Sequence, residues 1–247
     1  MTSDDLDGAV VALAAAVRVV ALTGAGVSAE SGVPTFRGTG GLWEGHRVEE
    51  IASPEAWRAD PLVVWRFYET RRRKLATVSP NPGHLVLARW QERFEEFALV
   101  TQNVDGLHQA AGSRDVIELH GNIWRVRCTG CGAERMERRQ LDEMPPRCPR
   151  CGAAERPAVV WFGECLPEEP FERATRAALD AELLLVVGTS AQVYPAAGLV
   201  EMTAVNGGTV IEVNPEPSAL AHVASISLRG PSGEILPRLD ERLGEAS

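Results

Sequence analysis

The sequence predicts a doubly wound α/β protein that carries a second, smaller module. Short apolar runs rich in β-branched residues recur along the chain, as is typical of buried strands in a parallel sheet. The segments between them are long enough for crossover helices, and two cysteine pairs interrupt the pattern. The predicted strands are residues 19–22, 97–101, 116–119, 183–187 and 210–213, and crossover helices are expected over residues 82–94 and 195–205.

Length and composition limit the class of protein. A chain of 247 residues suits one large domain, or one domain with a small insert. Its 45% hydrophobic and 24% charged residues are ordinary for a globular protein, and its net charge of -9 argues against nucleic-acid binding through bulk electrostatics. No stretch approaches the roughly 18 apolar residues of a membrane span, and the acidic start lacks a signal-peptide pattern. We therefore expect a cytoplasmic protein with no membrane partner.

The turn after the first predicted strand matches a dinucleotide-binding pattern. Gly24, Gly26 and Ala29 fit G-x-G-x-x-G/A, in which the glycines permit a tight turn and close approach to a pyrophosphate, and the small third residue lets helix and strand pack closely. Such turns are common, and two departures matter here. No strand ending in an acidic residue follows about twenty residues later, where a dehydrogenase would hold the ribose. Instead Phe36 and Arg37 come next, which suggests that a nucleotide is bound but is not used for hydride transfer.

Polar clusters follow each predicted strand. They lie at residues 23–26, 102–105, 120–122, 188–190 and 214–216. Because ligands of doubly wound sheets bind at the carboxyl ends of the strands, five such clusters at one edge favour a binding site there. Two inserts interrupt the sheet, a largely helical one over residues 38–79 and a second over residues 123–159.

The second insert contains a metal-binding pattern. Cys128 and Cys131 form one pair with two residues between them, and Cys148 and Cys151 form another. In a reducing compartment this spacing indicates a structural zinc site, because four cysteine ligands leave no open coordination position for catalysis. Cys165 stands apart and is expected to be a half-buried thiol rather than a nucleophile.

Taken together, these motifs resemble those of the sirtuins, which are NAD-dependent protein-lysine deacylases. The matching segments are residues 24–37, 101–105, 119–122, the two cysteine pairs, 161–164, 188–190 and 213–216, in the order typical of that family. The resemblance implies a Rossmann-like NAD-binding domain of residues 1–38, 80–122 and 160–247. It also implies a helical insert at residues 39–79 that forms the acyl pocket, and a zinc ribbon at residues 123–159. NAD would lie in the cleft between the large domain and the smaller part.

The resemblance also implies a reaction. The carbonyl oxygen of an acyl-lysine attacks the nicotinamide ribose, nicotinamide leaves, and the acyl group moves to the ribose to give O-acyl-ADP-ribose and free lysine. His120 is placed as general base on a ribose hydroxyl, which suits a neutral imidazole near pH 7. Gln102, Asn103 and Asp105 would orient the ribose and the nicotinamide amide.

Further site residues follow from the resemblance. Phe36 and Arg37 would shield the reactive ribose from water, and Ser190 and Asn214 would hold the adenosine end. A peptide would add as a strand beside residues that the family uses for backbone pairing, namely Val160, Phe162, Gly163, Glu164, Val193 and Tyr194. The complete expected NAD-binding set is Gly24, Ala25, Gly26, Ser28, Ala29, Glu30, Thr35, Phe36, Arg37, Trp43, Gln102, Asn103, Val104, Asp105, Gly188, Thr189, Ser190, Asn214, Pro215, Glu216 and Ser232.

The helical insert bears on which acyl group is removed. Asp60 and the following proline predict the start of a helix that runs to about Leu75. Helical periodicity places Arg71 on its apolar face, where a guanidinium needs a carboxylate or similar partner. The other members of this face are Val64, Phe67, Tyr68 and Leu75, and the opposite face carries Arg66, Thr70, Arg73 and Lys74. The run of basic residues at 71–74 is otherwise expected to be a solvated surface around this one inward arginine.

By periodicity alone, Arg71 is best interpreted as a snorkelling side chain in a structural ion pair. However, Tyr68 and Arg71 resemble the Tyr-x-x-Arg motif of class III sirtuins, in which these residues bind the distal carboxylate of succinyl- or malonyl-lysine. Ala52 and Ala56 match small positions that widen the acyl pocket of that class. We therefore predict an enzyme that removes succinyl and malonyl groups, and also acetyl, from protein or peptide lysines.

Other interpretations remain open. Within the family, the protein could be mainly a deacetylase with a structural Arg71, or a mono-ADP-ribosyltransferase. An NAD oxidoreductase is disfavoured because the acidic ribose-binding residue is missing. A nucleic-acid- or protein-binding zinc module is disfavoured by the acidic balance and the full set of cleft motifs.

Overall fold

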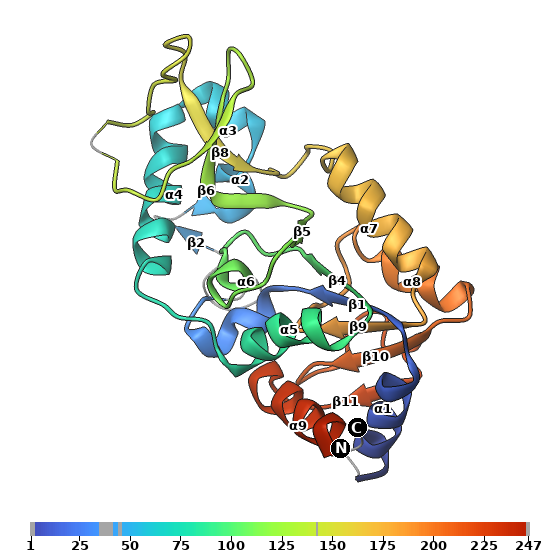
Figure 1. The fold of residues 1–247 in the computed structure, drawn as a ribbon. Coiled ribbons are helices and arrows are strands. Elements are labelled where there is room, and N and C mark those ends of the chain that lie inside the picture. The colour runs from blue at the N-terminus through green and yellow to red at the C-terminus, as the bar shows by residue number, and fades with distance from the viewer. Residues whose placement is uncertain (1–2, 35–41, 44–45, 142, 246–247) are drawn as a thin grey trace.

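The computed structural model describes residues 3–34, 42–43, 46–141 and 143–245 (Figure 1). Its main feature is a six-stranded parallel sheet with the order β11-β10-β9-β1-β4-β5. Numbered along the chain, this is the doubly wound order, in which the chain builds outward from β1 in both directions. The strands are β1 (Arg18–Thr23), β4 (Glu96–Thr101), β5 (Ile117–Glu118), β9 (Leu183–Val187), β10 (Thr209–Val213) and β11 (Ile226–Leu228). All five predicted strands are therefore present, and β11 was not predicted.

Helices cover both faces of this sheet. Val19 and Ala21 of β1 pack in one apolar core, whereas Val20 and Leu22 pack in another, as expected for alternating side chains on a strand buried on both faces. The first core includes α1 (Ser3–Ala15), α5 (Pro82–Arg93) and α9 (Ser232–Glu245). The second includes α7 (Glu168–Asp180) and α8 (Gly198–Val205), at the right of Figure 1. The predicted crossover helices correspond to α5 and α8.

A smaller unit lies above the carboxyl edge of the sheet in Figure 1. Its antiparallel sheet has the order β7-β6-β8, with β6 (Gly121–Cys128), β7 (Glu134–Met136) and β8 (Glu155–Val159). Beside it are the hairpin of β2 (Leu42–Trp43) and β3 (His46–Arg47), then α2 (Val48–Ile51), α3 (Pro54–Ala59) and α4 (Pro61–Leu75). The third apolar core joins these helices to β6, β8 and the segment after β8. The smaller unit is thus the predicted zinc ribbon plus helices.

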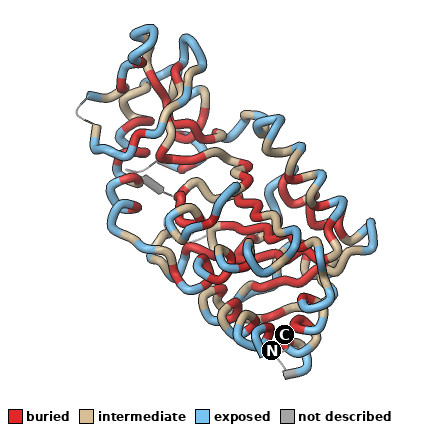
Figure 2. The backbone as a smooth tube through the Cα atoms, viewed as in Figure 1, coloured by how far each residue is buried: buried red, intermediate tan, exposed pale blue. Residues whose placement is uncertain are grey.

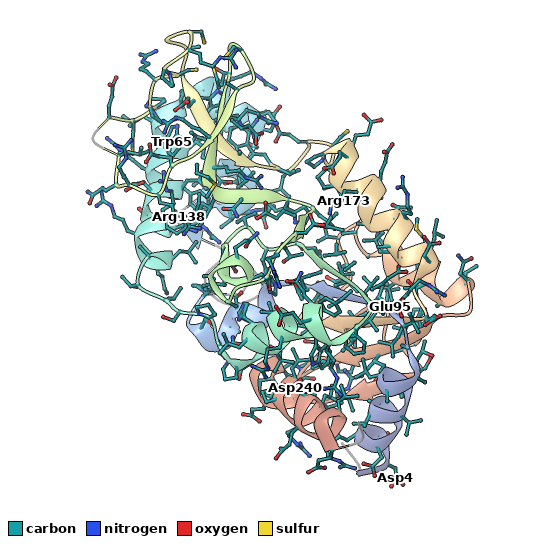
Figure 3. The ribbon with its side chains drawn as sticks, viewed as in Figure 1. Asp4, Trp65, Glu95, Arg138, Arg173 and Asp240 are labelled. Carbon is teal, nitrogen blue, oxygen red and sulfur yellow. The ribbon has the colours of Figure 1, made fainter. Side chains whose placement is uncertain are left out.

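The start of α4 follows the prediction residue by residue. The Asp60 carboxylate accepts hydrogen bonds from the backbone N–H groups of Leu62 and Val63, at 2.9 and 3.3 Å, and Pro61 opens the helix. The indole N–H of Trp65, labelled in Figure 3, donates to the carbonyl of Glu155 in β8 at 2.8 Å. This buried bond fixes the helix against the small sheet.

Two short helices, η1 (Ala25–Ser31) and α6 (Leu107–Ala110), follow β1 and β4. Figure 2 shows buried residues along the strands of the large sheet and along part of the smaller unit. Among the described residues, no helix combines the length and the apolar character needed to cross a membrane.

Candidate active site

The carboxyl ends of the central strands form the candidate site. β1 lies between β4 and β9, which is where the winding direction reverses and where doubly wound proteins bind ligands. Backbone hydrogen bonds hold the strand-end loops together across this edge. Gly24 N–H donates to the Val187 carbonyl at 3.0 Å, and Gln102 N–H donates to the Thr23 carbonyl at 3.0 Å. The sequence prediction that polar clusters meet at one edge is therefore confirmed.

The glycines of the first turn allow two loops to touch. A Cβ on Gly26 would lie 2.7 Å from the Cα and the carbonyl oxygen of Gly188, and one on Gly24 would lie 2.6 Å from the Thr189 Cβ. Gly188 itself has a φ of +58°, and its added Cβ would lie 2.3 Å from the Val27 nitrogen. Small residues are needed here because two backbones pack together, in addition to any approach by a phosphate. The small third residue was expected to let a helix pack closely on a strand, but Ala29 is exposed and does not have that role.

A buried polar network lies under this turn. The Ser28 hydroxyl donates to an Asp105 carboxylate oxygen at 2.8 Å, and the other oxygen accepts the Leu107 N–H at 2.9 Å. The Asn103 amide donates to the Gly24 carbonyl at 3.0 Å. Burial raises the pKa of Asp105, and the hydrogen bonds from Leu107 and Ser28 oppose that shift. The predicted site residues Ser28, Asn103 and Asp105, from the two loops that follow β1 and β4, are thus brought into one cluster.

Two buried histidines extend this network, and sequence reasoning missed both. The His84 Nε2 lies 3.3 Å from the Ser28 hydroxyl, and the His108 Nε2 lies 2.9 Å from the Thr23 hydroxyl. Burial lowers the pKa of His84 to about 4 and that of His108 to about 3, so both rings are neutral at pH 7. His84 is the third residue of α5 and His108 the second of α6; this position at a helix start near the sheet edge was the available signal.

His120 has the geometry of a general base. Its Nδ1 lies 2.8 Å from the Gln102 carbonyl oxygen, an acceptor, so Nδ1 carries the proton and Nε2 keeps its lone pair. Burial lowers the pKa of His120, while the bond to Gln102 acts in the opposite direction. The ring is therefore neutral at neutral pH, and Nε2 is the nitrogen that can accept a proton.

The remaining predicted nucleotide residues are placed as follows. The Gln102 amide donates to the Thr189 hydroxyl at 3.1 Å, and the Asn214 amide donates to the Thr189 carbonyl at 2.9 Å, so these loops are tied together. Glu30 instead accepts the Gly233 N–H at 2.7 Å, at the start of α9 and beside the buried Ser232. Ser190 and Val104 are half-buried, as is Ala25, whereas Pro215 and Glu216 are exposed. Thr35, Phe36, Arg37 and the Trp43 side chain lie outside the described residues.

The four cysteines of the smaller unit converge. The sulfur atoms of Cys128, Cys131, Cys148 and Cys151 all lie within 4.8 Å of one another, with 3.4 Å between the first and the last and 3.8 Å between the middle two. Zn–S bonds of about 2.3 Å in a tetrahedron place sulfurs about 3.8 Å apart, so the set fits zinc. Cys165 is exposed and not half-buried as expected; it directly follows the loop at residues 161–164, in which Phe162 and Gly163 are exposed as well.

Tyr68 and Arg71 lie about one turn apart on α4. Tyr68 is buried, and its hydroxyl accepts the Trp161 indole N–H at 3.1 Å. Burial raises the Tyr68 pKa to about 12, against the opposing charge of Arg71. Arg71 is half-buried; burial lowers its pKa, and Tyr68 and then Asp105 act in the opposite direction. Arg71 therefore lies within electrostatic range of both the phenol and the strand-end cluster. Ala52 and Ala56 pack in the same apolar group.

Comparison with known proteins agrees with this geometry. A model of the Sir2 family matches residues 24–195. The chain belongs to the Sir2 family. It is 49% identical to "NAD-dependent protein deacylase 2" of Pyrobaculum aerophilum, over 94% of this chain and 93% of that protein. It is 48% identical to "NAD-dependent protein deacylase" of Pyrococcus furiosus, over 95% and 96% of the two chains.

Solved structures of Sir2 proteins are also similar. A Sir2 homologue in complex with NAD superposes with a TM-score of 0.93 at 44% identity, covering 97% of this chain and 94% of that one. A Sir2 complex with a p53 peptide and NAD+ superposes with a TM-score of 0.86 at 32% identity, over 100% of both chains. These likenesses span the large sheet and the smaller unit together.

In this Sir2 protein, one prediction about α4 is wrong. Arg72 is only 2% exposed, so Arg71 is not the single inward arginine of the basic run. The Arg72 guanidinium donates to the carbonyls of Glu137 and Arg139 and pairs with the buried Glu69 at 3.7 Å. The zinc ribbon covers this side of the helix, and helical periodicity cannot reveal a second buried face made by a distant part of the chain. As predicted, Arg66, Thr70, Arg73 and Lys74 are exposed.

The predicted peptide-binding residues of the Sir2 chain lie on two segments. Phe162 is 51% exposed, and its N–H donates to the Ala52 carbonyl at 2.9 Å. Val160 is half-buried and donates its N–H to the His120 carbonyl at 2.9 Å, while Gly163 is exposed with a φ of +86°. Val193 and Tyr194 are 50% and 59% exposed on the loop after β9.

Proposed function

We infer that this chain is an NAD-dependent protein-lysine deacylase, and we propose that it prefers acidic acyl groups, succinyl and malonyl, while also accepting acetyl. The first part rests on family membership and on relatives that are named as NAD-dependent protein deacylases over almost their whole length. The structure of a relative with a peptide and NAD+ supports acylated proteins or peptides as partners. The second part rests on α4.

We propose a division of roles among the segments. Residues 1–38, 80–122 and 160–247 would bind NAD, residues 39–79 would form the acyl pocket, and residues 123–159 would hold a structural zinc ion. NAD, when bound, supplies the activated ribose and the nicotinamide leaving group. Uncharged amides and hydroxyls at the strand ends, such as Gln102, Ser190 and Asn214, suit ribose and carboxamide groups. Asn103 and Asp105 would orient the nicotinamide end.

His120 would remove a proton from a ribose hydroxyl. The Gln102 carbonyl holds its Nδ1–H, which leaves Nε2 as the basic atom. Because burial lowers the His120 pKa, the ring is in the basic form at neutral pH.

The single observation that carries the acyl proposal is the pairing of Tyr68 and Arg71 on the inner face of α4. A guanidinium can bind a carboxylate through two parallel hydrogen bonds, and the adjacent phenol can donate a third. Because burial raises the Tyr68 pKa to about 12, the phenol keeps its proton and stays a donor at neutral pH. Acetyl-lysine has no distal carboxylate, so it would gain nothing from this pair.

One observation favours the alternative that Arg71 is structural and the enzyme mainly a deacetylase. The Arg71 guanidinium carbon lies 5.4 Å from the centre of the Phe67 ring, within the range of a cation–π contact. Arg71 also lies near the Asp105 charge. These contacts give the guanidinium partners without a substrate.

The experiment that decides between them measures nicotinamide release from NAD with two peptides that differ only in acetyl- or succinyl-lysine. Arg71→Met should lower kcat/KM for the succinyl peptide about 100-fold, since a bidentate charge-assisted pair contributes about 3 kcal/mol. For the acetyl peptide, kcat/KM should change by about threefold or less, because acetyl-lysine has no carboxylate to pair with Arg71.

Arg66→Met is the matched control, since Arg66 lies on the exposed face of the same helix. Arg66→Met should leave kcat/KM unchanged for both peptides. An equal loss on both peptides in Arg71→Met would show that Arg71 supports the fold or NAD binding, and would contradict the acyl proposal.

A further inference from the structure

The loop at residues 161–164, which follows β8, is held in place by Arg156. Arg156 of β8 is 8% exposed, and its two terminal nitrogens donate to the two carboxylate oxygens of Glu164 at 2.6 and 2.8 Å. One of these nitrogens also donates to the Val159 carbonyl at 2.9 Å. Glu164 accepts the Trp161 backbone N–H at 2.9 Å as well. The loop from 161 to 164 is thereby closed on itself and fastened to the zinc ribbon strand.

The same guanidinium also fixes an aromatic ring. The Arg156 guanidinium carbon lies 3.2 Å from the centre of the Trp161 ring, so the two planes are in contact. The Trp161 indole N–H in turn donates to the Tyr68 hydroxyl at 3.1 Å. A continuous chain of contacts therefore leads from Arg156 through Trp161 to the Tyr68 phenol.

We propose that Arg156 is a positioning residue that sets peptide affinity and acyl preference together, through the loop at 161–164 and through the Tyr68 phenol. The inference deepens the proposed function and rests on it for the acyl arm. Arg156 touches neither the proposed acyl group nor NAD; it acts through Glu164 and Trp161. Sequence reasoning did not identify it.

Two physical features of the cluster support this role. The loop also donates the Phe162 N–H to the Ala52 carbonyl at 2.9 Å, so its backbone lies between the helical insert and the zinc ribbon. Only a planar fork can bind both oxygens of Glu164 and lie flat on Trp161 at the same time. Arg156→Lys would keep the positive charge but would lose one hydrogen bond to Glu164 and the contact between the guanidinium and the Trp161 ring. Without that contact the Trp161 indole, which donates to Tyr68, would no longer be held in place.

The test uses the full-length, zinc-loaded enzyme with paired acetyl- and succinyl-lysine peptides. We expect Arg156→Lys to raise KM for the acetyl peptide about tenfold with kcat changed less than about threefold. We expect the ratio of succinyl to acetyl kcat/KM to fall about tenfold as well. KM for NAD should stay within about twofold, which a general loss of structure would not allow. Trp161→Phe keeps a ring under Arg156 but removes the N–H donor to Tyr68, so it should lower the ratio and leave peptide KM unchanged.

Arg173→Lys is the matched control, because Arg173 is also paired with a carboxylate, that of Asp115 at 2.7 Å, but lies on α7 away from the helical insert (Figure 3). It should alter none of these parameters. Unchanged peptide KM and acyl ratio in a folded Arg156→Lys enzyme would overturn the proposal, as would a loss confined to kcat. If the wild-type enzyme does not act on the succinyl peptide, the acyl preference under the proposed function fails, while the acetyl KM still tests Arg156.

Discussion

Adjacent arginines of α4 are expected to have different roles, and replacing Arg72 tests this most clearly. Arg72 is 2% exposed and pairs with Glu69, which is 4% exposed. It donates to two carbonyls of the zinc ribbon, and its guanidinium carbon lies 5.5 Å from the Trp124 ring centre. Arg72→Met keeps the apolar stem but removes every one of these contacts.

The size of the effect follows from what remains buried. Removing one partner of a buried ion pair costs about 3–5 kcal/mol when the other charge is left uncompensated. Here Glu69 keeps a hydrogen bond from Arg73 at 3.3 Å, which places the cost at the low end of that range. The carbonyls of Glu137 and Arg139 also lose a donor, but these terms overlap with the first and are not added to it. We therefore expect Arg72→Met to lower the free energy of unfolding by about 3 kcal/mol, which corresponds to about 10 °C in Tm for a chain of this size.

Urea unfolding followed by circular dichroism, on zinc-loaded protein, measures this change. Arg71→Met is the comparison, and it should alter stability by about 1 kcal/mol or less, since Arg71 is half-buried and assigned to substrate. Glu69→Gln added to Arg72→Met should recover part of the loss, because the buried charge is then removed. A change under about 1 kcal/mol in Arg72→Met would refute this account of the helix.

Three further predictions concern the sheet edge and the zinc ribbon. Burial lowers the pKa of His84 to about 4 and that of His108 to about 3. Below pH 6.5 the unfolded chain therefore binds protons at these two histidines that the folded chain does not bind. As a result, the free energy of unfolding should fall by up to about 2.7 kcal/mol for each pH unit between pH 6.5 and 4. Urea titrations at pH 7.5, 6.0 and 5.0 measure that slope. Gly26→Ala places a methyl 2.7 Å from Gly188, and initial-rate kinetics should show KM for NAD raised about tenfold or more. Cys131→Ser should lose bound zinc, measured by atomic absorption, and with it the ordered zinc ribbon and most activity.

Each of these has its own control. His108→Gln should reduce the pH slope by about half, and an unchanged slope would assign it to other groups. Gly244→Ala adds a methyl that meets nothing within 4 Å and should leave KM for NAD unchanged. Cys165→Ser should retain zinc, because Cys165 is outside the cysteine cluster. Full zinc content in Cys131→Ser would contradict a four-cysteine site.

Local signals in the sequence were sufficient for the sheet and for α4. The strands 19–22 and 183–187 are continuous apolar runs, as expected of strands in a sheet covered on both faces, and β1 and β9 indeed lie side by side. Asp60 and Pro61 fix the helix start by backbone capping, which acts within a few residues. Zinc spacing is equally local, so the cysteine cluster was predictable as well.

What escaped prediction depends on contacts between distant segments. Arg72 and Glu69 are buried by the zinc ribbon, more than sixty residues away in the sequence, and Arg156 is buried by the loop at residues 161–164 and its Trp161. His108 pairs with Thr23 across 85 residues. The explanation of Gly26 by close approach to a pyrophosphate was also incomplete. The Gly188 backbone lies so close that it, too, leaves no room for a side chain at residue 26. None of these contacts has a periodic or spacing signal in the chain, although Gly26 itself belongs to the G-x-G-x-x-G/A pattern.

The proposed preference for acidic acyl groups is tested most directly on the wild-type enzyme. The measurement is kcat/KM for nicotinamide release with matched succinyl- and acetyl-lysine peptides. The account predicts a higher value for the succinyl peptide, with Tyr68 and Arg71 at its carboxylate. A higher value for the acetyl peptide would contradict that preference and leave Arg71 structural, and no release from either peptide would contradict the deacylase reaction itself.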